Sequence, residues 1–275
     1  MVSQPVSEAV NFLPSPFQSG LGYSTMCVAR SALCCYLDIQ GDDFGQHKHM
    51  RRFMKGAFEL KPALPKHIHV WDVDLVLSYL ENLFPHDRPT LKEMSSKLAA
   101  LLALLSGQRR QTVHKLNLDD MNLDDSRCVF YITSLFKQSR KGRHLAPIEL
   151  LAYPSNTKLC IVTVLREYLH GTKNIRKRQR QLLLSYQKPH HPVSNGTLAR
   201  WVRDTLQRAG VDTLLSSAHS TRSACTSAAA CRGSPIDVIM KAAGWSAAST
   251  FTRIYKKTPV LNLGQTLLDA YWQKK

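Results

Sequence analysis

Residues 218–229 read AHSTRSACTSAA, and residues 243–255 read AGWSAASTFTRIY. The first stretch places His219 and Arg222 three residues apart, which puts an imidazole and a guanidinium on one face of a helix. The second stretch ends at Tyr255, a phenol near the C-terminus. A cationic pair with a phenol predicts a site that binds a phosphate and uses tyrosine as a nucleophile. Because such short strings are common by chance, the prediction depends on further basic groups elsewhere.

The charge of the chain indicates a polyanionic partner. Among 275 residues, 37 Lys and Arg stand against 20 Asp and Glu, which gives a formal net charge of +17. Nearly all of this excess lies after residue 62, since the first 62 residues are almost balanced. Nucleic acid is the commonest partner of so basic a protein. An acidic membrane surface is the alternative, but it would require a basic amphipathic helix, and none stands out.

Cysteine usage and the N-terminus favour a soluble intracellular protein. The seven cysteines form no CxxC pair and no zinc-finger spacing with histidine, so we expect free thiols in a reducing compartment. The N-terminal MVSQPVSEAV lacks the basic and apolar regions of a secretory signal. The longest apolar run, around 98–105, is too short to cross a membrane.

Breaks in the hydrophobic pattern divide the chain into two predicted domains. Residues 1–62 are expected to be a small helical domain that includes a basic helix over 46–57. Pro62 and Pro65, flanked by lysines, mark a linker. Residues 69–275 are expected to form a larger and mainly helical domain.

The larger domain is predicted to contain many helices and one hairpin. Helices are expected over 71–83, 91–105, 157–170, 197–209, 219–232, 235–243, 248–256 and 262–272. Two β-rich runs, 128–136 and 143–148, are joined by a basic turn and predict an antiparallel hairpin, and 182–186 predicts a short strand. The acidic stretch 119–125 lacks the spacing of a calcium loop and is expected to be a solvated loop. The fold class is therefore mainly α with a small antiparallel β-sheet (α+β).

Seven separated motifs resemble, in order and spacing, the tyrosine recombinase (phage integrase) family. They are similar above all to its eukaryotic branch, encoded by DIRS-like, Ngaro-like and Crypton-like mobile elements. The motifs are GLGYSTMCVARSAL (20–33), RFMKGAFELKPALP (52–65), WDVDLVLSYL (71–80), SGQRRQT (106–112), LARWVRDTL (198–206) and the two stretches quoted first. The resemblance implies a SAM-like helical core-binding domain and an integrase-like catalytic domain around double-stranded DNA. It also implies a nuclear recombinase of a mobile element that acts as a homotetramer.

The resemblance assigns the catalytic roles. Tyr255 would attack the scissile phosphate and form a 3′-phosphotyrosyl link. Arg109 and Arg222 would stabilise charge on the non-bridging oxygens, for which planar guanidinium groups are well suited. His219 would steer or accept the tyrosine proton. No metal or other cofactor is implied.

The resemblance also bears on a tryptophan, a lysine and a second arginine. Trp245 stands where bacterial relatives usually carry histidine, and its indole N–H donates a hydrogen bond but cannot shuttle a proton, so packing and phosphate contact are expected. The lysine that protonates the leaving 5′-oxygen is Lys137 or Lys141. Lys137 is favoured, because a strand end holds a side chain more firmly than a turn. Arg110 is expected to face the DNA backbone or solvent.

DNA contacts are expected from both domains. On the small domain the candidates are Ser24, Thr25, Arg30, His47, Lys48, Arg51, Arg52 and Lys55. Arg110 and Lys141 are the candidates on the large domain. These groups would mostly contact phosphates, so binding should depend steeply on salt. The basic run 173–180 fits a nuclear localisation signal, a DNA contact or a solvated charge run equally well.

The sequence leaves open whether the protein cuts DNA and how its C-terminal helix docks. A domesticated or decayed copy would bind DNA without cutting it, which the interruption of the first helix by Pro14 and Pro16 favours. A type IB topoisomerase would share the chemistry, although the core-binding resemblance argues against it. An apolar stripe over 263–271 predicts a C-terminal helix that docks on a neighbouring protomer or folds back on its own domain.

Overall fold

The structure is a computed structural model that describes residues 4–36, 44–62, 70–83, 89–136, 139, 146–214, 216, 220–245 and 251. The chain divides into two compact units, residues 1–66 and 67–275. Four predicted site residues lie outside the described residues, namely Lys137, Lys141, His219 and Tyr255. The expected C-terminal helix also lies outside them.

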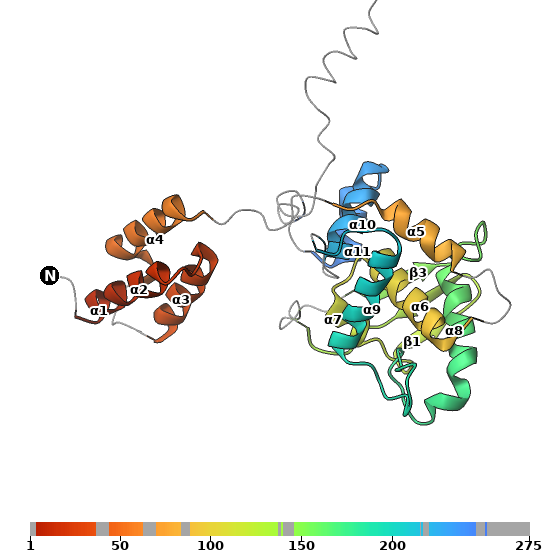
Figure 1. Ribbon diagram of the computed structural model, residues 1–275. Coiled ribbons are helices and arrows are strands. Elements are labelled where there is room, and N and C mark those ends of the chain that lie inside the picture. Colours follow the sequence, from red (N-terminus) through yellow and green to blue (C-terminus); the bar gives the residue numbers. More distant parts are fainter. Residues whose placement is uncertain are drawn as a thin grey trace, which may run out of the picture. The chain divides into compact units, whose positions relative to one another are not determined.

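The first unit is helical (Figure 1). It contains α1 (Gln4–Phe12), α2 (Pro14–Gln18), α3 (Tyr23–Tyr36), the 3-10 turn η1 (Phe44–Gln46) and α4 (Lys48–Leu60). Pro14 and Pro16 both lie in the first turn of α2, where proline is tolerated because the first N–H groups of a helix have no intrahelical partner. The core of the unit consists of Leu13, Met26, Phe44, Met50 and Met54.

The second unit is built around α6 (Leu91–Ser106), which runs between α8 (Ile161–Arg176) and α9 (Asn195–Arg208) (Figure 1). Thr90 and Glu93 form a capping box at its start: Glu93 Oε2 accepts from Thr90 N at 2.8 Å, and Thr90 Oγ1 accepts from Glu93 N at 3.3 Å. The apolar run after Lys97 is buried against the neighbouring helices. The helix ends at Gly107, whose φ of +60° is a conformation that glycine adopts without strain.

A three-stranded antiparallel sheet packs beside α6 in the order β1 (Met121–Leu123), β2 (Arg127–Phe130) and β3 (Ile148–Leu151). Side chains of β2 and β3 alternate between core and surface, and the paired Cys128 and Leu150 are both buried. The structure thus confirms an antiparallel hairpin but with other bounds: β2 ends at Phe130, earlier than expected, and β3 begins only at Ile148, where the second run was expected to end.

The sequence prediction was wrong about the acidic stretch 119–125. It contains β1, and its four aspartates are engaged: Asp119 with Arg180, Asp120 with Thr133, Asp124 with Ser126 and Arg127, and Asp125 with Arg166. The hydrogen bonds from Ser126 hold the pKa of the Asp124 carboxyl below its usual value. The stretch therefore contains an edge strand of the sheet and is not a loop throughout, whereas its aspartates remain exposed or half-buried, as a solvated stretch predicts.

Two further elements differ from expectation. Residues 182–186 form only an isolated bridge, Leu184 with Pro192, because proline has no N–H to extend a ladder. Helix α8 continues six residues beyond its predicted end at residue 170. The buried Arg176 holds this last turn, since its Nη1 donates to Gln181 O at 2.6 Å and its Nη2 to Leu182 O at 2.9 Å. Within the described part of the chain, no helix is long and apolar enough to span a membrane.

The remaining helices of the second unit are α5 (Val73–Asn82), α7 (Arg110–His114), α10 (Ser220–Cys231) and α11 (Ile236–Ala243). Helix α10 packs on α5, α6 and α11. The motif residues of the second unit thus lie on helices that contact one another or in the turns that join them.

Candidate active site

The candidate site is organised around the C-terminal end of α11. The amide of Gly244 donates to Lys241 O at 3.1 Å, and the amide of Trp245 donates to Met240 O at 2.9 Å. With Gly244 at φ +65°, this is a Schellman motif. A glycine is required here because a side chain would strain this left-handed conformation. The motif reverses the chain and turns Trp245 back toward the helix.

Side chains from two other elements satisfy the last two carbonyls of α11. Gln108 Nε2 donates to Ala242 O, and Arg222 Nη2 donates to Ala243 O, both at 2.6 Å. A helix normally leaves its last four carbonyls without intrahelical partners. Here all four accept hydrogen bonds, two from the Schellman turn and two from these side chains. The turn after α6 and helix α10 are thereby fixed to the same point.

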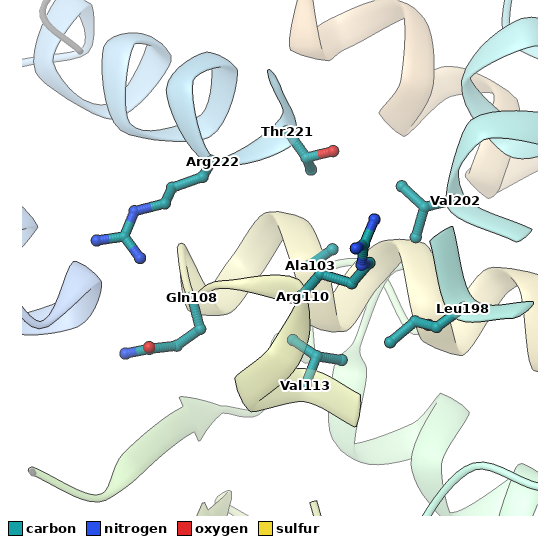
Figure 2. A pocket seen from close by; sticks show the side chains of 8 residues that line it. All are labelled: Ala103, Gln108, Arg110, Val113, Leu198, Val202, Thr221 and Arg222. Atoms are coloured by element: carbon teal, nitrogen blue, oxygen red, sulfur yellow. The ribbon is translucent and has the colours of Figure 1, made fainter. Parts of the chain in front are cut away.

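Arg222 is the most buried charged group of the site, with 2% of its surface exposed. Its guanidinium carbon lies 4.5 Å from the ring centroid of Trp245, a cation–π distance. Trp245 packs in turn against Phe251, with ring centroids 5.6 Å apart. Figure 2 shows the side chains of Gln108 and Arg222 reaching toward the same side, away from Arg110. The favourable end of the α11 dipole further stabilises the cation.

Arg109 lies one residue beyond Gln108, at the N-cap position of α7. Its Nη1 is buried and has no hydrogen-bond partner among the described residues. A buried N–H group without a partner is costly, so this atom is suited to an anionic ligand. The neighbouring Arg110 is different, because its Nε donates to Asn195 Oδ1 at 2.9 Å and the residue is half-buried.

Helix α10 approaches the turn after α6 closely. A methyl group in place of the Gly107 hydrogen would lie 3.7 Å from Thr226 Cγ2 and 3.9 Å from Cys225 Sγ. Burial raises the pKa of the Cys225 thiol to about 12, so this cysteine is an inert packing group. The contact places the segment that carries Arg109 against the helix that carries Arg222.

The predicted DNA-binding residues of the first unit lie on α3 and α4 or at the start of α4. Ser24, Thr25, Lys48, Arg51, Arg52 and Lys55 are exposed, and Arg30 and His47 are half-buried. His47 also has a structural role, because its Nδ1 accepts from His49 N at 3.4 Å and caps α4. The exposed cations of α4 form a basic surface suited to phosphate contacts.

Gln108 is the residue that the sequence interpretation missed. Its only signal was its position, between the helix-ending Gly107 and Arg109. The bond to Ala242 joins residues 134 positions apart, which no local pattern reveals.

Residues 75–259 match the family model described as the phage integrase family. The chain belongs to the phage integrase family. The matched span contains Arg109, Arg222, Trp245 and Tyr255. Among curated proteins, no sequence matches this chain.

Solved structures of similar fold include three recombinases. XerH site-specific recombinase bound to difH in a post-cleavage complex has a TM-score of 0.64 at 15% identity, covering 98% of this chain and 72% of that one. The Tn1549 transposon integrase with transposon right-end DNA has a TM-score of 0.58 at 14% identity, covering 96% and 84%. The lambda integrase tetramer on a Holliday junction has a TM-score of 0.56 at 14% identity, covering 92% and 64%. At these identities the similarity establishes the fold of this chain.

Proposed function

We propose that this integrase is a site-specific recombinase of a mobile element that cuts and rejoins DNA through a 3′-phosphotyrosyl intermediate on Tyr255. The observation that carries the proposal is the buried guanidinium of Arg222, held by Ala243 O and the face of Trp245. A cation fixed in this way is a preorganised donor for a scissile phosphate, because it need not reorganise during the reaction.

In the proposed reaction, the Oη atom of Tyr255 forms a bond to phosphorus while the bond to the 5′-oxygen breaks. His219 takes the tyrosine proton, and Lys137 gives a proton to the 5′-oxygen. Arg109 and Arg222 donate to the non-bridging oxygens, whose charge increases in the transition state. Attack by the 5′-hydroxyl of another strand reverses these steps and restores Tyr255.

Trp245 would support this chemistry from behind Arg222. Its ring is 7% exposed and contacts both the guanidinium and Phe251. This burial favours a packing role, with any phosphate contact made by the indole N–H. Trp245 therefore fixes the direction in which Arg222 points.

We further propose that the first unit is the core-binding domain and that the integrase acts on duplex DNA as a homotetramer in the nucleus. The net charge of +17 and the exposed cations of α4 support a DNA partner. A tetramer is the state in which the lambda integrase was solved on a Holliday junction. Strand exchange between two duplexes requires four cleavages, which a tetramer supplies.

The test is covalent trapping on a library of randomised duplexes, each carrying a nick near a possible cleavage point. A nicked strand loses a short fragment after attack, so the covalent intermediate accumulates. We expect a phosphotyrosyl adduct that mass spectrometry maps to Tyr255 and that Tyr255→Phe abolishes while DNA retention persists. Adduct formation by the Tyr255→Phe protein would refute the assignment. Retention of DNA by the wild-type chain without any adduct would instead support a DNA-binding protein that does not cut.

A further inference from the structure

The motif WDVDLVLSYL at residues 71–80 has no part in the chemistry above, yet its first residue contacts the catalytic motif. Trp71 lies two residues before α5 and packs against the main core of the second unit. Its Nε1 donates to Ser220 Oγ at 2.9 Å. Ser220 is the first residue of α10, directly after His219 and two residues before Arg222. The indole therefore holds the first turn of the helix that carries Arg222.

The start of α5 also contacts the other end of α10. Asp74 accepts from Arg232, just beyond the last residue of α10, with Nη2 and Oδ1 2.5 Å apart. Asp72 caps α5 by accepting from Asp74 N at 2.9 Å, which fixes the direction of this segment. One short segment, residues 71–74, thus contacts α10 at its first residue and just beyond its last.

The two buried contacts on the first turn of α10 act from different sides. Ser220 and Arg222 are two residues apart, which separates their side chains by about 200° around a helix with 3.6 residues per turn. Ser220 is held by Trp71, whereas Arg222 is held by the end of α11. Both residues are buried. Rotation of α10 about its axis would therefore break both contacts together.

We propose that Trp71 is a positioning residue for the reaction, which sets the rotation of α10 and with it the direction in which Arg222 points. The contact between Trp71 and Ser220 is observed in the structure, whereas its effect on the reaction rests on the proposed recombinase function. Trp71 lies where the chain enters the second unit, so this entry segment is part of the support of the site. Misplacement of a reacting group by about 1 Å can cost roughly 100-fold in rate.

The contact can be tested first in the free protein by hydrogen exchange. Trp71→Phe keeps an aromatic ring but removes the donor, and Ser220→Ala removes the acceptor. We expect amides in the first two turns of α10 to exchange at least about fivefold faster in both variants, with α6 unchanged. Trp201→Phe is the matched control, because it makes the same chemical change in the same core, where the ring stacks on Tyr186. Unchanged exchange in α10 would overturn the proposal, whatever the activity of the chain.

The effect of Trp71 on the reaction is tested by the rate of single-turnover adduct formation, on the nicked duplex selected in the trapping experiment. Trp71→Phe and Ser220→Ala should each slow the reaction about 10- to 100-fold, with the Kd for DNA changed by less than about twofold. The double variant should be no slower than either single one, and Ser220→Thr should restore most of the rate. Independent, multiplicative effects or a loss confined to DNA affinity would overturn the positioning role. If the wild-type chain forms no adduct, the proposed function fails, and the exchange experiment still decides the contact.

Discussion

Lys97 is a fully buried lysine on α6, so its replacement should change how stability depends on pH. None of its surface is exposed, and burial lowers its pKa from 10.5 to about 8, an effect that nearby Glu167 and Glu81 oppose. In the unfolded chain the side chain has its ordinary pKa of about 10.4. Between pH 8 and pH 10 the unfolded chain therefore holds a proton that the folded chain has lost. The contribution of Lys97 to the free energy of unfolding accordingly rises with pH through this window.

The size of the effect follows from the difference between the two pKa values. The two pKa values differ by about 2.4, which at roughly 1.4 kcal/mol per pH unit corresponds to about 3 kcal/mol, and the folded protein loses this free energy in full below pH 8. Lys97→Met keeps the length of the side chain without its charge. We expect this variant to be more stable than the wild type at pH 7, by up to about 3 kcal/mol. The advantage should disappear as the pH approaches 10.5.

Urea denaturation of both proteins at several pH values between 7 and 10.5 measures this difference directly. The comparison is necessary because the thiols of Cys128 and Cys225, whose pKa desolvation raises to about 12, lower stability at high pH in both proteins. Lys92→Met is the matched control, since Lys92 lies exposed on the same helix and its loss should change stability by less than about 0.5 kcal/mol. A stability difference for Lys97→Met that stays constant with pH would refute the reasoning.

Three further predictions concern the site and its DNA. Gly107→Ala should lower the free energy of unfolding in urea by about 1–2 kcal/mol, because φ is +60° although the added methyl meets no clash. Trp245→Phe, which keeps an aromatic face for Arg222, should slow adduct formation less than Trp245→Ala does, and equal rates would contradict the packing role. Arg51→Gln should make the plot of log affinity against log salt shallower by about 0.9 in filter binding, whereas an unchanged slope would exclude a phosphate contact.

The sequence predicted best those elements whose signals are local. Helix α6 begins after Thr90 with Glu93 in place for a capping box and ends before Gly107, so both ends could be predicted from adjacent residues. The end of α8 could not, because Arg176 is held by carbonyls of residues 181 and 182, which lie after the helix in the chain. Strand β1 was missed for a similar reason: the aspartates on either side of it have partners as distant in sequence as Arg180.

The candidate site shows the same limit. The sequence motifs and the family resemblance identified Arg222 and Trp245, and the structure brings these two side chains into contact. The contacts that orient them could not be predicted from the sequence, because Gln108 and Ala242 are 134 residues apart and Trp71 and Ser220 are 149 apart. The roles of His219, Lys137 and Tyr255 stay predictions, since these residues lie outside the part of the chain that the structure describes.

The fully hydrogen-bonded end of α11 has a consequence for how the protein would lose its proposed activity. Its last carbonyls accept from Gln108 and Arg222 as well as from its own turn, so the helix end cannot fray unless both side chains are released. Local opening in proteins occurs in cooperative units. The end of α11, the turn after α6 and the start of α10 should therefore open as one such unit. Under mild denaturation, exchange of the last α11 amides and loss of the proposed strand cleavage should follow a single transition.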